Sequence, residues 1–258
     1  MCWDAPGGGG QRSPMPGTAP NLQGPRGSRL PSSRHPPSPR VLFDLDGTLT
    51  DPREGIVGSM RFAFAGLGLP APADDVLARE IGPPLSEAFG RHLPDPTPER
   101  IDRAIALYRE SFGDVGWREN AVYPDVPALL EAVTGRGWRA GVATSKPTVF
   151  AERITRHFGL RRHFGAVYGS ELDGTRGAKP ELLAHVLARE GAEARTTVMI
   201  GDRRHDVEGA RAVGARSIGV TWGYGGREEL EAAGADWVCA TAGEVLAALE
   251  VALGDGGR

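Results

Sequence analysis

Short apolar runs alternate with helix-like stretches from residue 41 onward, and this alternation constrains the fold more than any other feature. The apolar runs occur at 41–43, 138–143, 165–168, 197–200, 216–220 and 236–239. Between the later runs, helical patterns cover about 148–158, 180–190, 204–213, 227–233 and 243–253. Strands that alternate with helices of this length are typical of βαβ units. The pattern therefore predicts an α/β fold, a doubly wound parallel sheet with right-handed crossovers.

The segment 54–120 interrupts this alternation, because it contains no convincing strand. Helical patterns occur in it at 54–67, 84–92 and 98–112. We expect residues 54–120 to form a small helical domain inserted after the first strand. The α/β core would then consist of residues 40–53 and 121–258.

The first forty residues differ in composition from the rest of the chain. They hold 9 of the 21 prolines, 7 of the 37 glycines, five arginines and one acid, without apolar periodicity. We expect residues 1–39 to be a disordered N-terminal extension, since a segment of this composition cannot bury a core. They also lack the continuous apolar segment of a secretory signal.

Composition narrows the classes of function. The net charge of −3 argues against a nucleic-acid partner, and no apolar run approaches the roughly 18 residues of a membrane span. With only two cysteines, Cys2 and Cys239, a disulfide framework is not expected and the reducing cytoplasm is the default location. No P-loop occurs in the sequence. We therefore expect a cytoplasmic protein, monomer or homodimer, with no membrane partner.

Two aspartates follow the first apolar run, in the stretch VLFDLDGTLTD at 41–51. An aspartate at the edge of a buried strand loses hydration, which costs free energy unless a partner compensates. A turn would explain the Asp46-Gly47 dipeptide but not Asp44. Asp44 therefore requires a partner from elsewhere in the chain.

Other polar groups occupy equivalent places, close to the ends of apolar runs. They are Thr144, Ser145 and Lys146 after GVA, Asp202 and Asp206 after TVMI, and Lys179 at the start of the helix before TVMI. Because parallel strands end at one edge of a sheet, we expect these groups to converge with Asp44. Lys146 and Lys179 are the only lysines among 30 basic residues. Each is a candidate for a place where a compact ammonium serves better than a guanidinium.

The residue types in this set favour phosphoryl chemistry. Clustered carboxylates repel one another and must be neutralised by a proton, a lysine or a metal ion. Oxygen-only ligands suit Mg²⁺. A threonine hydroxyl, neighbouring backbone amides and a lysine can bind the oxygens of a phosphoryl group. Together with a carboxylate that has no other task, the set favours nucleophilic attack on phosphorus.

The motifs resemble, in order and spacing, the four motifs of the haloacid dehalogenase superfamily. They are DLDGT at 44–48, TSKP at 144–147, Lys179-Pro180 and GDRRHD at 201–206. The resemblance covers roughly residues 40–253. IGPPL at 81–85 and SELDGTR at 170–176 make it closest to the phosphoglycolate phosphatase and 5′-nucleotidase-like branch, whose members carry a helical cap. It implies a Rossmannoid core, Mg²⁺ as cofactor and a small phosphorylated metabolite as substrate.

The resemblance also implies roles for individual residues. Asp44 would be the nucleophile that forms a phosphoaspartyl intermediate, and Asp46 would protonate the leaving alcohol and then activate water. Mg²⁺ would be held by the Asp44 carboxylate, the Asp46 backbone carbonyl and Asp202. The catalytic set would be completed by Thr144 and Lys179, and the substrate-binding set would be Thr144, Ser145, Lys146 and Lys179. Since dehalogenase members lack the second acid, Asp46 favours phosphoryl chemistry over carbon–halogen cleavage.

Two alternative functions stay open at this point. A phosphomutase uses the same nucleophile but returns the phosphoryl group to a sugar phosphate, and a non-catalytic phosphate-binding protein could use the same scaffold. The intact acids and Lys179 argue against the second. The sequence does not choose between phosphoglycolate and a nucleoside 5′-monophosphate. It also leaves open the roles of Arg176, Arg203 and Asp206, and of the loop from Trp222 to Tyr224.

Overall fold

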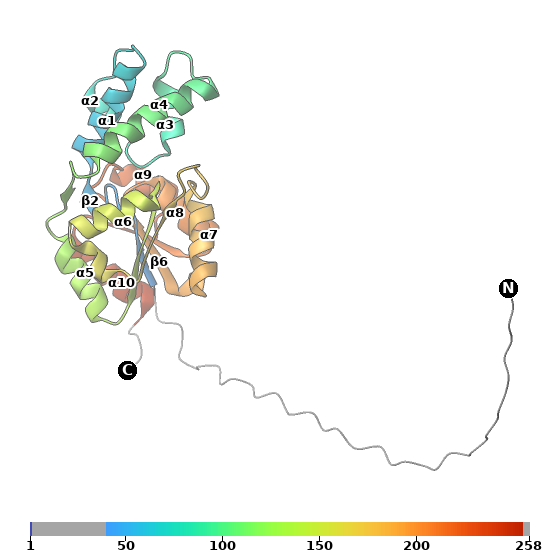
Figure 1. Cartoon of the computed structure of the whole chain (residues 1–258). Coiled ribbons are helices and arrows are strands. Elements are labelled where there is room, and N and C mark those ends of the chain that lie inside the picture. The colour runs from blue at the N-terminus through green and yellow to red at the C-terminus, as the bar shows by residue number, and fades with distance from the viewer. Residues whose placement is uncertain (2–39, 255–258) are drawn as a thin grey trace. The chain divides into compact units, whose positions relative to one another are not determined.

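A six-stranded parallel sheet forms the centre of the computed structural model, which describes Met1 and residues 40–254 (Figure 1). In sheet order the strands are β5 (Ala166–Ser170), β4 (Arg139–Pro147), β1 (Arg40–Phe43), β6 (Thr197–Gly201), β7 (Arg216–Val220) and β8 (Trp237–Cys239). The chain therefore starts in the middle of the sheet, builds one side with β4 and β5, and returns to build the other. The expected disordered extension 1–39 lies, apart from Met1, outside the described residues.

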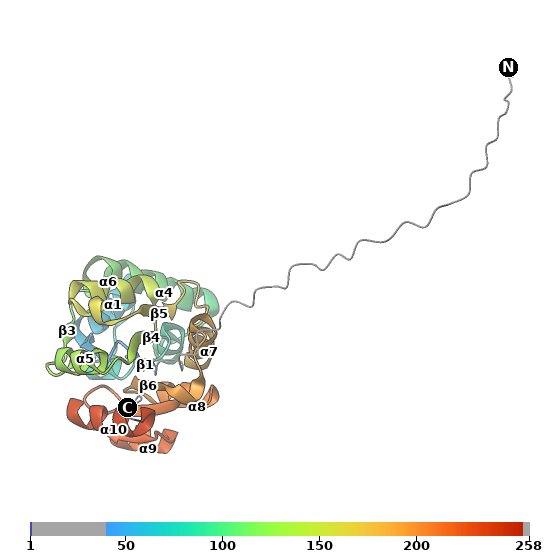
Figure 2. The same cartoon turned by 90° about the horizontal axis from the view of Figure 1, so that it is seen from below.

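Helices cover both faces of the sheet. They are α5 (Val126–Gly135), α6 (Thr148–His157), α7 (Lys179–Glu190), α8 (Arg204–Ala212), α9 (Arg227–Ala233) and α10 (Ala242–Leu253), with the short turns η2 (Leu160–His163) and η3 (Ala194–Thr196). Figure 2 shows α7 and α8 on one side of the sheet and α5 and α10 on the other. The predicted doubly wound α/β fold is thus confirmed. Within residues 40–254, every helix is too short or too polar to span a membrane.

The central strands are apolar on both faces because both faces are covered. In β1, Val41 and Phe43 belong to the large core cluster, whereas Leu42 packs in a second cluster with side chains of α7 and α8. The register aligns Phe43 with Val142 of β4 and with Ile200 of β6. The carboxyl ends of these three strands therefore lie at one edge of the sheet.

The core strands and the helices from α6 onward lie close to their predicted positions, but two features of the core were not predicted. Helix α5 was overlooked, although Leu129, Leu130 and Val133 are buried along it. Strand β4 continues to Pro147, four residues past the predicted end at 143, because its pairing with β5 shifts register between Ala143 and Pro147.

A helical segment lies between β1 and β4 in sequence and begins and ends at a two-stranded antiparallel sheet of β2 (Thr50–Asp51) and β3 (Ala121–Val122). It contains α1 (Arg53–Gly66), α2 (Asp74–Ala78), α3 (Leu85–His92), α4 (Pro98–Ser111) and the π-helical turn η1 (Phe112–Gly116). We call Arg53–Gly116 the cap segment. The short helix α2 was not predicted, since five residues are too few to show a period. The exact domain boundaries, 54 and 120, stay a prediction.

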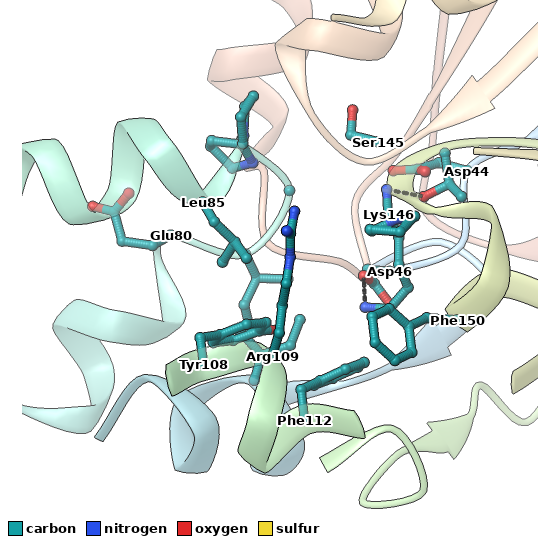
Figure 3. Close-up of a pocket in the computed structure, with 17 residues that line it drawn as sticks. Asp44, Asp46, Glu80, Leu85, Tyr108, Arg109, Phe112, Ser145, Lys146 and Phe150 are labelled. Atoms are coloured by element: carbon teal, nitrogen blue, oxygen red, sulfur yellow. Dashed lines mark hydrogen bonds and ion pairs between the residues drawn. The ribbon is translucent and has the colours of Figure 1, made fainter. Parts of the chain in front are cut away.

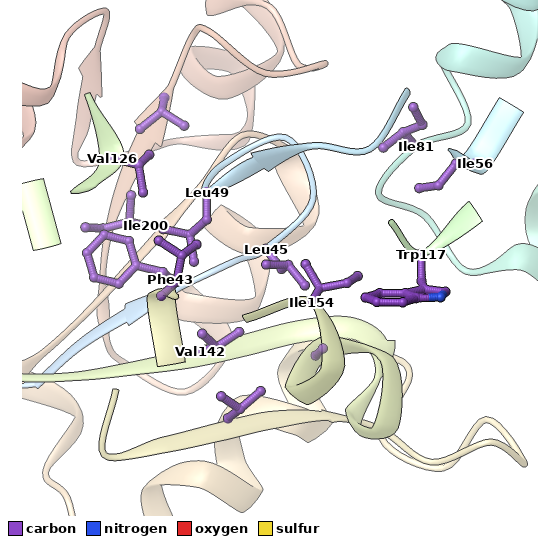
Figure 4. Packing of buried hydrophobic residues seen from close by; sticks show 14 of the residues in the cluster. Phe43, Leu45, Leu49, Ile56, Ile81, Trp117, Val126, Val142, Ile154 and Ile200 are labelled. Atoms are coloured by element: carbon purple, nitrogen blue, oxygen red, sulfur yellow. The ribbon is translucent and has the colours of Figure 1, made fainter. Parts of the chain in front are cut away.

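The apolar core continues from the sheet into the cap segment (Figure 4). Leu45 and Leu49, in the loop after β1, are fully buried and belong to the same cluster as Ile56 and Ile81 of the cap segment. Burial of this apolar surface is the main force that holds the cap segment on the core. The loop after β1 therefore lies where core and cap segment meet.

Candidate active site

The loop after β1 carries Asp44 and Asp46 and turns sharply at Gly47. The Asp44 backbone amide donates a hydrogen bond of 2.8 Å to the Ile200 carbonyl, which fixes Asp44 beside the end of β6. Gly47 has a φ of 83°, and a Cβ atom there would lie 2.2 Å from the Asp202 Oδ2 atom. Only glycine both adopts this conformation easily and leaves room for Asp202.

Asp202 follows β6 and lies at the point where the strand order reverses, between β1 and β6. Such a crevice at the carboxyl ends of the strands is the usual ligand site in an open α/β sheet. Asp202 is fully buried and accepts hydrogen bonds from the Thr48 hydroxyl (3.2 Å) and the Tyr224 amide (2.7 Å). Burial, with the nearby charges of Asp206 and Asp44, raises its pKa well above the ordinary value. A cation would favour the charged form.

Lys179 is the partner that Asp44 required. As the first residue of α7, it is 4 % exposed, and its Nζ atom lies 3.2 Å from Asp44 Oδ1 and 2.6 Å from Asp206 Oδ1. The Nζ atom also donates a hydrogen bond of 3.0 Å to the Ala143 carbonyl. Burial acts to lower the Lys179 pKa, but the charges of Asp206 and Asp44 outweigh it, and the pKa is raised. The ammonium is therefore permanently charged beside Asp44.

Asp206, whose role the sequence left open, holds Lys179 in place. Its Oδ2 atom accepts a hydrogen bond of 3.1 Å from the Arg203 amide at the start of α8, while Oδ1 faces Lys179. Burial raises the Asp206 pKa to about 6, although Lys179 acts against this rise. The carboxylate thus orients the lysine that in turn contacts Asp44.

Asp46 is paired with the other lysine. The Lys146 Nζ atom lies 2.5 Å from Asp46 Oδ2 and 4.5 Å from the centre of the Phe112 ring in the cap segment. Burial raises the Asp46 pKa, and Lys146 opposes the rise. Lys146 was predicted to bind substrate; the structure places it in the pocket and on Asp46 at the same time.

Thr144 and Ser145 lie at the end of β4 and line the same pocket as Asp44 and Asp46. The Thr144 hydroxyl accepts a 3.3 Å hydrogen bond from the Lys146 amide. The Ser145 carbonyl accepts one of 2.9 Å from the Ser170 hydroxyl of β5. The polar groups predicted to converge therefore do lie together at the sheet edge.

Three carboxylates are arranged so that they could hold a metal ion. Asp44, Asp202 and Asp206 each offer one oxygen, and these oxygens lie within 4.8 Å of one another. Apart from their ion pairs with Lys179, the buried Oδ1 atoms of Asp44 and Asp206 have no hydrogen-bond partner. Such a set of oxygen ligands fits Mg²⁺. Asp206 was not among the predicted ligands, and coordination by the Asp46 backbone carbonyl stays a prediction.

The cap segment forms one wall of the pocket that Asp44, Asp46 and Lys146 line from the core (Figure 3). The cavity has a volume of about 80 Å³. Its lining from the cap segment includes Ile56, Glu80, Tyr108, Arg109 and Phe112. Tyr108 and Phe112 stack with ring centres 5.4 Å apart. Sequence reasoning missed these residues; the spacing of four between the two aromatic residues was the one available signal, and it indicates only a shared helix face.

Arg203 and Trp222, whose roles the sequence left open, connect the loops of the site. The Arg203 guanidinium donates to the Ile81 carbonyl of the cap segment and lies 3.0 Å from Glu229. The Trp222 indole donates a 3.1 Å hydrogen bond to the Thr48 carbonyl. Arg176 instead pairs with Glu171. Arg203 therefore links the core to the cap segment, and the Trp222 loop supports the turn that carries Asp46.

Residues 41–220 match the sequence model of a protein family that is described as haloacid dehalogenase-like hydrolase. The chain belongs to this family. The resemblance read from the four motifs is thus confirmed, and the predicted enzyme class agrees with relatives that are named phosphatase or 5′-nucleotidase.

Three relatives illustrate the range of names in this family. A 5′-nucleotidase of Pseudomonas aeruginosa is 49 % identical over 82 % of this chain and 96 % of that protein. A protein of Mycobacterium tuberculosis named tyrosine-protein kinase PtkA is 43 % identical over 72 % of this chain, but this chain spans only 62 % of its length. A phosphoglycolate phosphatase of Yersinia pestis is 30 % identical over 81 % of this chain and 92 % of its own.

A solved structure agrees with these relatives. A predicted phosphatase from Clostridium acetobutylicum superposes with a TM-score of 0.79 and is 38 % identical, covering 82 % of this chain and 98 % of its own. The similarity thus includes both the sheet and the cap segment.

Proposed function

We propose that the chain is a Mg²⁺-dependent phosphatase that hydrolyses a small phosphomonoester through a phosphoaspartyl intermediate. One observation carries the proposal: Asp44, paired with Lys179, and Asp46, paired with Lys146, line one pocket at the carboxyl end of β1. Two carboxyl groups with different surroundings suit two different tasks in one reaction.

Asp44 is suited to be the nucleophile. The Lys179 ammonium stabilises its carboxylate and is itself held by Asp206. The hydrogen bond from the Asp44 backbone amide to the Ile200 carbonyl keeps the attacking group at the sheet edge. A fixed nucleophile converts attack on phosphorus into an effectively unimolecular step.

Asp46 is suited to be the general acid and then the general base. Its burial raises the pKa and favours the protonated form that can donate to the leaving oxygen. Lys146 opposes this effect, so that the carboxyl can release its proton and afterwards accept one from water. The same side chain can thus serve both halves of the reaction.

Mg²⁺ would be held by Asp44 and Asp202, with Asp206 and the Asp46 carbonyl as further oxygen donors, and would neutralise charge on the phosphoryl group. The Thr144 hydroxyl and the Ser145 amide would bind phosphoryl oxygens. Phe112 and Tyr108 of the cap segment would keep bulk water from the intermediate.

The names of the relatives support both proposed substrate types, nucleoside 5′-monophosphates and phosphoglycolate. The phosphomutase and the phosphate-binding protein remain as alternatives. The name of the mycobacterial relative adds a third, a kinase that transfers a phosphoryl group to tyrosine. Location in the cytoplasm and assembly as a monomer or homodimer stay predictions.

The test is a screen of phosphorylated metabolites with Mg²⁺ in which released phosphate is measured. We expect release that stops in EDTA and in Asp44→Asn protein. Isomer formation without release would favour the mutase. Phosphate transfer from ATP to a tyrosine peptide would favour the kinase, and binding without turnover the non-catalytic scaffold.

A further inference from the structure

Arg109 of α4 is a cation in the pocket without a carboxylate partner. No ion pair joins it to an acidic residue in the described part of the chain, and its Nε atom is buried without a hydrogen-bond acceptor. Figure 3 shows its side chain extending from α4 between Leu85 and the Asp46–Lys146 pair. A buried guanidinium nitrogen without an acceptor is costly unless a ligand supplies one.

Every other charged side chain that lines the pocket already has a partner of opposite charge. Asp44 is paired with Lys179 and Asp46 with Lys146. Glu80 is paired with Arg91 and with His92, whose Nε2 atom lies 2.8 Å away. The unpaired charge in this pocket is therefore positive and belongs to Arg109.

Arg109 also lies where the pocket meets a second cleft. A second, open cleft adjoins the pocket, and the two share the lining residues Pro84, Leu85, Arg109, Ser145 and Pro147. With the phosphoryl group on Asp44, we expect the alcohol part of a substrate to extend toward these shared residues. Arg109 is then placed to contact the alcohol part of the substrate.

We propose that Arg109 determines substrate specificity by binding an anionic group, a carboxylate or a second phosphate, on the alcohol part of the phosphomonoester. This inference rests on the proposed phosphatase function. The planar guanidinium can donate two parallel hydrogen bonds to either anion. Esters of uncharged alcohols leave Arg109 without an acceptor and are the poorer substrates.

The experiment compares substrates that differ only in this charge. Phosphoglycolate and glycol bisphosphate represent the two anions, and hydroxyethyl phosphate is their uncharged counterpart. The quantity measured is the ratio of kcat/KM for each anionic ester to that for hydroxyethyl phosphate. In Arg109→Gln protein this ratio should fall by about 10- to 100-fold, the effect of losing a charged hydrogen bond.

Two further variants make the result specific. Arg103→Gln removes the same charge from the exposed side of α4 and should leave the ratio unchanged. Arg109→Lys keeps the charge but not the planar fork and should restore part of the preference. The two anionic esters separate a site for carboxylate from a site for a second phosphate.

A binding measurement separates the inference from the proposed function. Asp44→Asn protein with and without Arg109→Gln is titrated with phosphoglycolate and hydroxyethyl phosphate, and only the anionic ester should lose affinity. If wild-type protein releases phosphate from none of the metabolites in the screen, the proposed function fails, whatever the binding shows. If it hydrolyses other phosphomonoesters but not the two anionic esters, the inference about Arg109 is wrong although the phosphatase stands. If Arg109→Gln weakens all esters equally, or none, the inference about Arg109 is wrong although the phosphatase stands.

Discussion

Asp44 and Asp46 are two residues apart, yet their surroundings give the two carboxyl groups different properties. Lys179 lies 3.2 Å from Asp44 and is itself anchored by Asp206, so that a fixed positive charge faces the first carboxylate. Burial raises the pKa of Asp46, and its lysine partner comes from the end of β4. The difference between nucleophile and acid therefore comes from the neighbours rather than from the aspartates.

The change Asp46→Asn should separate the two steps of the reaction. Loss of general acid–base assistance typically costs about 10²–10⁴-fold, so hydrolysis of an alkyl ester should fall by that factor. With p-nitrophenyl phosphate the leaving group departs without a proton, and a burst of nitrophenol should precede slow turnover. Mass spectrometry should then find phosphate on Asp44. Asp44→Asn is the control, and turnover like wild type in that protein would refute the assignment.

Gly47→Ala should damage the site more than the fold. Its Cβ atom would lie 2.2 Å from Asp202, and φ is 83°. The matched control is Gly68→Ala, where φ is 70° but no atom lies within 4 Å of the new Cβ. Both changes should cost about 1 kcal/mol through the left-handed backbone. Only Gly47→Ala should also lower activity, by at least about 10-fold, because it displaces Asp202. Equal activities in the two variants would contradict this account.

At the scale of elements, the site depends on contacts that join loops of the core to the cap segment. Arg203, just before α8, donates to the Ile81 carbonyl while its Nε atom contacts Glu229. The Lys146 ammonium lies against the Phe112 ring of η1. These contacts hold the cap segment over the carboxyl ends of β1 and β4. Movement of the cap segment would have to break them.

We expect Arg203→Ala to loosen the cap segment without removing a reacting group. The Michaelis constant should rise several-fold, because one charged hydrogen bond is lost, while kcat changes less. Hydrogen exchange of amides near Ile81 should become faster. Arg204→Ala is the control, since Arg204 forms an exposed pair with Glu208 four residues on. If both variants behave alike, Arg203 does not link cap segment and core.

Helices and strands with a clear hydrophobic period could be predicted from the sequence. Contacts between side chains of different elements could be predicted only in part. The strand at 197–200 and the acid after it could be read from the sequence because a parallel sheet brings strand ends together. The partner of Lys146, by contrast, depends on how β4 ends. That Arg109 faces the site depends on how α4 packs, because helical periodicity does not say which partner covers a helix face. The role of Asp206 required knowing where the first turn of α8 points.

In the molecule as a whole, the apolar core stabilises the folded state, whereas the clustered carboxylates of the site destabilise it. One core cluster runs from the sheet through Leu45 and Leu49 into the cap segment, and it stabilises the packing of the cap segment on the core. At the sheet edge, three buried carboxylates lie together with the single ammonium of Lys179 in contact with two of them. Clustering of negative charge destabilises the folded state, and a bound cation would offset that cost.

Mg²⁺ should therefore raise the melting temperature of the whole protein. At a concentration of 100 times its Kd, a ligand that binds only the folded state adds about 2.7 kcal/mol to the free energy of unfolding. The melting temperature should rise in Mg²⁺ and fall back in EDTA. Asp202→Asn should abolish the shift, whereas the exposed Asp75→Asn should keep it. An equal Mg²⁺ shift in Asp202→Asn protein would show that the ion binds elsewhere.

The Mg²⁺ shift should also depend on pH, with a sign set by Asp206. Its folded-state pKa is raised to about 6 from 3.8, so the metal-free folded protein binds a proton more readily than the unfolded chain. That proton stabilises the metal-free protein as pH falls from about 6 to about 4, and it competes with the metal for the same carboxylate. The Mg²⁺ shift in melting temperature should thus shrink below pH 6. Asp206→Asn should weaken this dependence, and a shift that grows as pH falls would contradict the assignment of these carboxylates to the metal.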